Sequence, residues 1–190
     1  MELNRSKIIL LVAGVAFTLY VGNIYFKSLK PPDHIHSRDD VPQGNAQQGP
    51  SPQEIKALEA RLANEPDNLQ LVFELGHIYL NTGQYLKAEE IFLKGTESWP
   101  DNAEMLVDLG VAQRGLGKIN EALSTLSQAT QKFPEYGDSW LQLAVLYRFN
   151  LKNNKKALDY FEKYLSLEDE GETASKVRQE IKRIKNEMQQ

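Results

Sequence analysis

The sequence predicts an all-α protein in which a solenoid of helical hairpins follows one transmembrane helix. A 34-residue self-similarity runs through residues 69–170, which is the signature of a helical repeat array. An uncharged apolar stretch covers residues 8–26. The composition, 41% hydrophobic and 25% charged, is sufficient for a packed core in a chain of 190 residues.

Charge and cysteine content exclude several classes of function. The chain has no cysteine, which removes disulfides, thiolate metal sites and cysteine nucleophiles. Residues 53–171 carry 12 Lys and Arg against 19 Asp and Glu. Because an acidic domain repels phosphate backbones, we expect no nucleic-acid partner.

Residues 8–26 are predicted to be a transmembrane anchor that follows a short tail, residues 1–7. Nineteen helical residues span roughly 28 Å, close to the ~30 Å of a hydrocarbon core. The alternative is a signal peptide cleaved after Ala16, which would leave a short apolar core. The folded mass comes after the apolar stretch, which favours a single-pass protein whose domain lies outside the cytoplasm. In a bacterium that is an inner-membrane protein with a periplasmic domain.

Residues 27–51 are predicted to be a flexible linker. They are rich in Pro, Gly, Asn and Gln and nearly lack large apolar residues, so they cannot bury enough surface to offset the entropy of ordering. His34 and His36 form a pair in this segment, but no third metal ligand accompanies them. We therefore expect two solvated histidines.

The repeat places small residues at fixed positions. Leu75-Gly76 recurs as Leu109-Gly110, and again as Leu143-Ala144 after another 34 residues. Ala88 recurs as Ala122. Small residues at these positions allow two antiparallel helices to approach closely, and large apolar residues fill the space around the contact.

This pattern resembles the tetratricopeptide repeat. The resemblance implies repeats at residues 69–102, 103–136 and 137–170, the first two closed by Pro100 and Pro134. The third repeat departs from the pattern, because Ala157 and Phe161 come one residue late. We interpret this as a one-residue insertion in the turn at residues 150–154.

Two further helices are predicted to flank the repeats. Residues 52–66 begin with a capping box of Ser51 and Glu54, with Pro52 at the first helical position. Residues 172–190 carry one apolar stripe and one charged face, as expected of a helix that caps a solenoid. A coiled coil is the weaker interpretation of this tail, since it spans barely two heptads.

The sequence contains no pattern that predicts catalysis. The glycines between Gly110 and Lys118 have the wrong spacing for a phosphate loop, and no strand precedes them. His77 is the only histidine in the repeats and has no recognisable nucleophile beside it. We expect no enzyme activity, no cofactor, no metal and no small-molecule substrate.

The resemblance implies that the first helix of each repeat lines a concave groove that binds other proteins. The residues predicted to form this groove are Phe73, His77, Leu80, Val107, Val111, Arg114, Leu141, Val145, Arg148 and Phe149. Their apolar surplus favours a helical or extended apolar peptide, with Arg114 and Arg148 available to a carboxylate. The alternative is that some of them pack against a neighbouring helix or the C-terminal helix.

One further resemblance concerns the purpose of the module. Residues 58–68 are similar to the periplasmic repeat domain of bacterial cytochrome c maturation factors, which implies an assembly factor that holds an apocytochrome tail. Two alternatives remain: a structural scaffold that joins membrane-complex subunits, and a receptor for targeting peptides that faces the cytosol.

Overall fold

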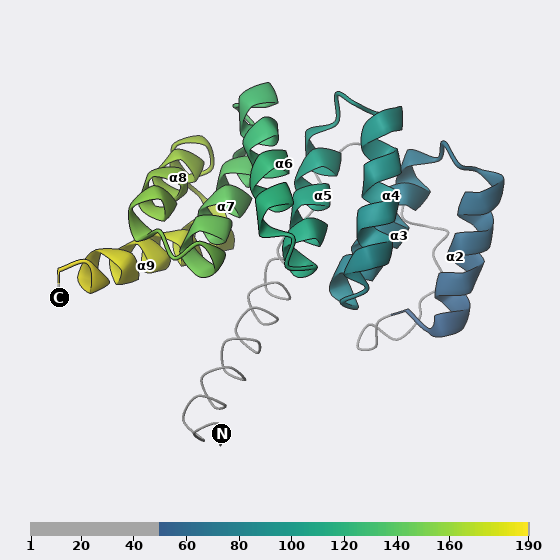
Figure 1. Cartoon of the computed structure of the whole chain (residues 1–190), viewed down its shortest axis with the longest axis horizontal. Coiled ribbons are helices and arrows are strands. Elements are labelled where there is room, and N and C mark those ends of the chain that lie inside the picture. The colour runs from purple at the N-terminus through teal and green to yellow at the C-terminus, as the bar shows by residue number, and fades with distance from the viewer. Residues whose placement is uncertain (1–49, 190) are drawn as a thin grey trace, which may run out of the picture. The chain divides into compact units, whose positions relative to one another are not determined.

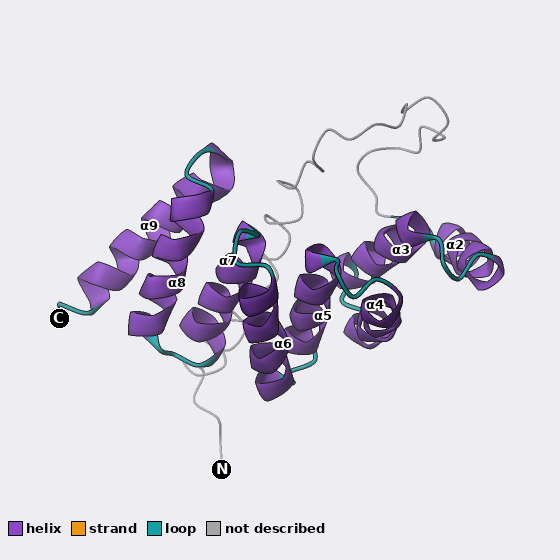
Figure 2. Ribbon diagram, turned by 90° about the horizontal axis from the view of Figure 1, so that it is seen from above, coloured by secondary structure: helices purple, strands orange, loops and turns teal. Residues whose placement is uncertain are grey.

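The computed structural model describes residues 50–189. The predicted tail, anchor and most of the linker (residues 1–7, 8–26 and 27–51) lie outside the described residues. Within residues 50–189 the chain forms eight α-helices, one of them extended by a π-helix, and no strand (Figures 1 and 2). The predicted all-α solenoid is confirmed.

The helices form three hairpins with one additional helix at either end. The bounds are α2 Pro52–Asn64, α3 Leu69–Asn81, α4 Tyr85–Ser98, α5 Ala103–Gly115, α6 Ile119–Lys132, α7 Gly137–Val145, η1 Leu146–Asn150, α8 Asn154–Leu167 and α9 Gly171–Glu187. Each helix packs on the next one along the chain. Figure 2 shows the helices following an arc, with α3, α5 and α7 on its inner side and α4, α6 and α8 on its outer side.

Small residues occupy the contact between the two helices of each hairpin, as the repeat predicts. A Cβ atom added to Gly110 would lie 2.7 Å from Cδ2 of Leu126, so α5 and α6 can approach only because this side chain is missing. Ala122 and Leu126 of α6 are fully buried at the same contact. The core of the described helices is therefore a continuous layer between successive helices.

Helix ends agree with the local sequence. At the start of α2 the amide of Glu54 donates to Oγ of Ser51 at 3.3 Å, and the amide of Ser51 donates to the Glu54 carboxylate at 2.6 Å. This confirms the capping box. Asn102 caps α5, where its Oδ1 accepts from the amide of Met105 at 3.0 Å. The α3–α4 turn contains Gly83 with φ of 72°, a conformation that favours glycine.

The extra residue of the third repeat lies in a different place from the one expected. The chain widens into the π-helix η1, where the amide of Leu151 donates to the carbonyl of Leu146 at 3.0 Å. Ala157 and Phe161 nevertheless remain buried, at 0% and 2% exposure. The insertion is thus absorbed mainly by the last turn of the helix before the loop, because a wide turn accepts one more residue without shifting the packed face of α8.

The two flanking helices differ in how many of their side chains are buried. Helix α9 buries three side chains of its apolar stripe, those of Ala174, Val177 and Ile184, against the last hairpin. Helix α2 has no buried residue. None of the helices in residues 50–189 combines the length and the apolar character needed to cross a membrane.

Candidate functional site

The inner surface of the arc is formed by α3, α5 and α7. Helix α5 contacts α7 directly. A hydrogen bond joins α3 to α5, with 2.8 Å between Nε2 of His77 and Oδ2 of Asp108. Side chains from three successive repeats therefore meet on one surface, which we call the inner surface.

The structure divides the ten predicted groove residues into two groups. Four belong to the core and have almost no exposed surface: Leu80, Val107, Leu141 and Val145. The other six are half-buried: Phe73, His77, Val111, Arg114, Arg148 and Phe149. The burial of the first group agrees with the packing alternative, because these side chains leave almost no surface for a ligand to contact.

Arg148 is already engaged within the molecule. Its Nε donates to Glu180 at 2.7 Å, and its two terminal nitrogens donate to the Glu187 carboxylate at 2.7 and 2.8 Å. The side chain of Asn154 accepts a further bond at 2.7 Å. The Glu187 carboxylate holds the pKa of Arg148 above its usual value. The guanidinium expected to receive a ligand carboxylate thus fastens α9 to the third repeat.

Carboxylates from different repeats gather on the inner surface. Asp108 is 13% exposed, and burial raises its pKa, although the hydrogen bond from His77 acts against this. Burial and the charge of Asp108 also raise the pKa of Glu104, one helical turn earlier on α5. Negative charge is therefore held here at an energetic cost.

The third repeat extends this acidic surface. Burial, together with the charges of Glu168, Asp108 and Glu104, raises the pKa of Asp138 to about 6. Burial likewise raises the pKa of Glu168, at the end of α8. Tyr136 precedes α7, and its pKa is raised by burial and by the neighbouring carboxylates. We call Glu104, Asp108, Asp138 and Glu168 the inner carboxylates.

His77 lies between aromatic rings and the inner carboxylates. Its ring centroid is 5.6 Å from that of Phe73 and 6.0 Å from that of Phe92. Burial alone would lower the pKa of His77, but the hydrogen bond with Asp108 and the charges of Asp108 and Glu104 raise it overall. The ring is fixed by its neighbours, and its Nε2 atom faces the carboxylates.

The inner carboxylates were not predicted as a site from the sequence. His77 and Asp108 are 31 residues apart, three short of the repeat length. Residues with such an offset lie on facing sides of adjacent first helices, so the period could have indicated the contact. The predicted groove rested instead on its apolar side chains, with Arg114 and Arg148 as the charged contacts.

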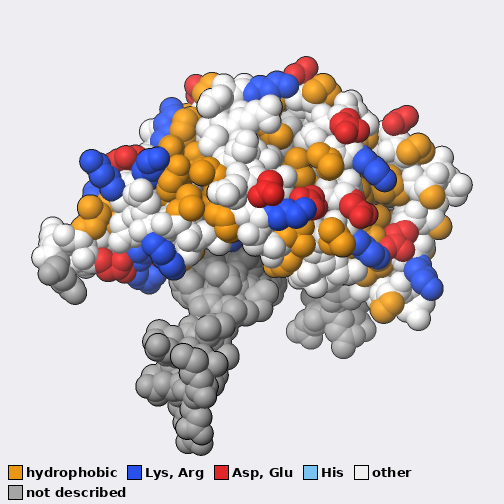
Figure 3. All heavy atoms as spheres, viewed as in Figure 1, with side chains coloured by type: hydrophobic (Ala, Val, Ile, Leu, Met, Phe, Trp, Pro, Cys, Tyr) orange, Lys and Arg blue, Asp and Glu red, His pale blue; other side chains and the backbone are white. Residues whose placement is uncertain are grey.

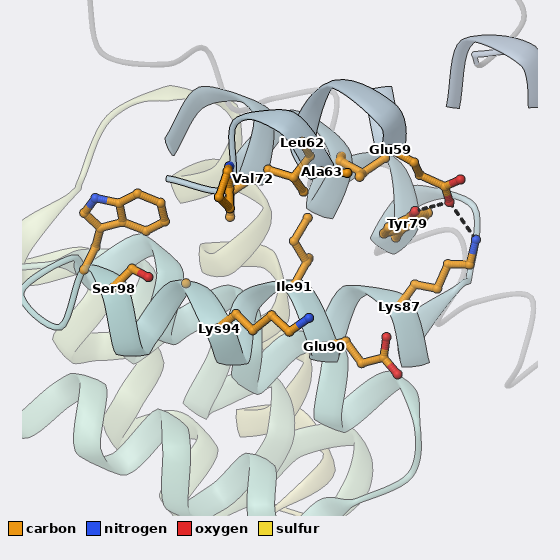
Figure 4. A pocket seen from close by; sticks show the side chains of 14 residues that line it. Glu59, Leu62, Ala63, Val72, Tyr79, Lys87, Glu90, Ile91, Lys94 and Ser98 are labelled. Atoms are coloured by element: carbon orange, nitrogen blue, oxygen red, sulfur yellow. Dashed lines mark hydrogen bonds and ion pairs between the residues drawn. The ribbon is translucent and has the colours of Figure 1, made fainter. Parts of the chain in front are cut away.

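A separate pocket of about 440 Å³ lies between α2 and the first hairpin (Figure 4). Val72, Leu75 and Ile91 contribute apolar surface to it. At its edge the Glu59 carboxylate accepts hydrogen bonds from the Tyr79 hydroxyl at 2.5 Å and from Lys87 at 2.8 Å. On the face shown in Figure 3, acidic and basic side chains are interspersed with hydrophobic ones.

Comparison with known families identifies the repeats. Residues 69–102 and residues 107–174 each match a tetratricopeptide repeat family. Together these matches cover more than half of the chain and coincide with the helical hairpins. The chain is therefore a tetratricopeptide-repeat protein, a class whose members mediate interactions between proteins.

Solved structures show the same fold. MamA (MSR-1) is 28% identical with a TM-score of 0.53, and the match covers 62% of this chain and 67% of that one. TTC0263, from Thermus thermophilus, is 23% identical with a TM-score of 0.59, covering 71% and 73%. The first repeat domain of Spaghetti (RPAP3), solved with an HSP90 peptide, is 21% identical with a TM-score of 0.57, covering 64% and 95%. No curated protein sequence matches the chain.

Proposed function

We propose that the protein is a membrane-tethered module that binds a segment of another protein on the inner surface of its repeats. The observation that carries this proposal is the inner surface itself. There the half-buried side chains of Phe73 and His77 on α3 lie next to α5, which carries the half-buried Val111. Partner binding on first helices also agrees with the role of this class of repeats.

The structure changes the expected chemistry of the bound segment. Arg148 is occupied by Glu180 and Glu187, so it offers no anchor for a ligand carboxylate. The inner carboxylates repel an acidic segment as well. A helical or extended apolar segment without acidic residues therefore fits this surface best, and its apolar side chains would contact Phe73 and Val111.

Peptides selected from a random-sequence display library against the full chain provide the test. We expect Val111→Asn to weaken binding of the selected peptides by roughly tenfold, since burial of one such side chain contributes about 1.5–3 kcal/mol before ordering costs. The matched control is Leu93→Asn on α4, where the side chain is 50% exposed on the outer helices. Titration calorimetry measures both, and circular dichroism checks the fold.

If the two variants have the opposite order of binding affinity, the ligand does not bind on the inner surface. If Leu93→Asn abolishes binding while Val111→Asn binds normally, the ligand occupies the outer helices. Leu141→Gln is unsuitable for this test because Leu141 is 0% exposed and its substitution would disturb the core.

The tether is proposed from the apolar stretch of residues 8–26, and the location of the domain from its place after that stretch in the chain. We expect carbonate extraction to leave the full-length protein in the membrane fraction, because 19 uncharged residues are long enough to span. N-terminal sequencing of the mature protein separates an anchor from a cleaved signal peptide. Protease protection in intact cells then tests the periplasmic placement.

An assembly factor, for example in cytochrome c maturation, is the biological role that we propose. The similarity of residues 58–68 supports it. A structural scaffold that joins membrane-complex subunits is the second candidate. Exchange of a labelled partner on the time scale of assembly supports the assembly factor, and a permanent complex supports the scaffold. Exposure of the domain to the cytosol would instead support a targeting-peptide receptor.

A further inference from the structure

Three metal-ligating side chains from two repeats converge on the inner surface. They are His77 from α3 and Glu104 and Asp108 from α5, and their ligand atoms all lie within 4.8 Å of one another. We propose that these residues form a binding site for one divalent transition-metal ion of the Zn²⁺ type. This inference goes beyond peptide binding and does not depend on it.

The distances suit coordination. Nε2 of His77 lies 2.8 Å from Oδ2 of Asp108 and 3.9 Å from Oε1 of Glu104. Two ligand atoms of a tetrahedral Zn²⁺ site, each about 2.0–2.2 Å from the metal, are separated by roughly 3.3 Å. The first distance is shorter than this value and the second is longer, so His77 and Asp108 would separate by roughly 0.5 Å and Glu104 would approach them by a similar amount to complete three ligand positions. One position would remain for water.

Neighbouring residues hold His77 and Asp108 in place, whereas the side chain of Glu104 is more exposed. Contacts with Phe73 and Phe92 fix the imidazole ring so that Nε2 points at Asp108. Asp108 is nearly buried, whereas the Glu104 side chain is 50% exposed and free to change rotamer. Glu104 and Asp108 are one helical turn apart, a spacing that places two side chains on the same face of a helix.

The ligand types and the local charge select the class of ion. One imidazole nitrogen with two carboxylate oxygens is a set that Zn²⁺, Co²⁺ and Ni²⁺ accept, while Mg²⁺ and Ca²⁺ prefer oxygen alone. Asp138 and Glu168 add negative charge around Asp108 and Glu104. A bound dication would offset the mutual repulsion of the inner carboxylates. Without a metal ion, the hydrogen bond between His77 and Asp108 does not remove the mutual repulsion of the inner carboxylates.

Zn²⁺ and Co²⁺ titrations of the tag-free full chain provide the test. Because His34 and His36 could bind metal by themselves, both are replaced by alanine in the reference protein. Calorimetry should then measure a stoichiometry of one bound Zn²⁺ ion per chain, and Zn²⁺ should raise the melting temperature of the protein. The expected Co²⁺ complex has a visible absorption spectrum that His77→Gln alters. Absence of saturable binding in the reference protein would overturn the proposal.

Variants of the ligands separate coordination from a structural role. His77→Gln, Asp108→Asn and Glu104→Gln should each weaken Zn²⁺ binding roughly tenfold or more. The matched control is Glu97→Gln, the same change at an exposed position of α4. Glu104→Gln decides the outcome if the other two variants lose their fold, since its side chain is half exposed. Undiminished binding by a folded Glu104→Gln variant would overturn the assignment.

Discussion

Gly110 shows how much the helical hairpin depends on a missing side chain. An added Cβ would lie 2.7 Å from both Cγ and Cδ2 of Leu126, which is itself fully buried. We expect Gly110→Leu to lower the free energy of unfolding by about 3 kcal/mol, because overpacking a filled core forces the helices apart. Thermal unfolding followed by circular dichroism measures the change.

The control for this substitution adds the same side chain at an open position. Ser124→Leu lies on the exposed side of α6, and we expect it to change the free energy of unfolding by less than about 0.5 kcal/mol. Equal melting temperatures for the Gly110 variant and the parent protein would show that the α5–α6 contact is not as close as described.

Asp138 makes the stability of the fold depend on pH. Its pKa is raised to about 6 in the folded chain, chiefly by burial, from a usual value of 3.8. The folded state therefore binds this proton more tightly than the unfolded state, and the stability that the proton provides is lost as pH rises from about 4 to above 6. Burial raises the pKa of Asp108 too, so the two groups act in the same direction.

Asp138→Asn should remove much of this dependence. A pKa difference of this size corresponds to about 3 kcal/mol at most, and screening by solvent at a half-buried position reduces it to on the order of 1 kcal/mol. We expect the variant to be more stable than the parent at pH 7.5 and to differ little from it at pH 4.5. Urea unfolding at the two pH values measures this. A variant less stable than the parent at pH 7.5 would show that the ionised carboxylate is stabilising.

At the scale of elements, the third repeat separates what the sequence could predict from what it could not. In the sequence, Ala157 and Phe161 come one residue later than the first two repeats predict, so an insertion was expected. Its place was not predicted, because no residue type between Leu146 and Asn150 marks a π-helix in the sequence. The loop after η1 still bends sharply, with Lys152 at a φ of 53°.

The attachment of α9 also depends on η1, which carries Arg148. Replacing Arg148 by Gln would remove the bonds to Glu187 and one of the two ion pairs of Glu180, which is 13% exposed and keeps its pair with Arg183. We expect a loss of about 1–3 kcal/mol and faster cleavage within α9, because the ion pairs between Arg148 and α9 are lost and the poorly exposed Glu180 is only partly compensated. Limited trypsin digestion followed by mass spectrometry locates the cleavage.

Arg183→Gln serves as the matched control for α9. Arg183 binds the same Glu180 at 2.6 Å, but its side chain is 55% exposed. A surface pair of this kind contributes little, so we expect a change below about 0.5 kcal/mol. If both variants are digested at the same rate as the parent, the apolar contacts of α9 alone fix the helix.

At the scale of the whole molecule, the repeat period predicted the architecture but not the site. Residues such as Leu75, Ala88 and Gly110 are dictated by contacts that recur in every repeat, so a single sequence identifies them. Whether the side chains of Leu141 and Val107 face a ligand or the core depends on how closely neighbouring repeats pack in space. A single sequence does not specify this distance. Both are buried. The contact of His77 with Asp108 likewise exists only once two repeats are stacked.

We expect the two flanking helices to contribute unequally to the stability of the solenoid. In a repeat array each element is stabilised by its immediate neighbours, so loss of an end helix costs about what its own interface contributes. Helix α9 buries Val177 and Ile184, each of which contributes about 1.5–3 kcal/mol. Helix α2 buries no residue completely and borders the 440 Å³ pocket.

Removal of either helix tests this asymmetry. In a chain that begins at Pro50, we expect deletion of residues 171–190 to lower the free energy of unfolding by about 3 kcal/mol or more, because it removes the buried Val177 and Ile184 and uncovers the face of α8 on which α9 packs. Deletion of residues 50–67 should cost less, about 1–2 kcal/mol, because no side chain of α2 is itself fully buried, although Val72 and Leu75 lose part of their cover. Urea unfolding of the three proteins gives both differences. An equal or larger loss on removing α2 would mean that α2 packs on the first hairpin more tightly than its burial indicates, and that the pocket closes in solution.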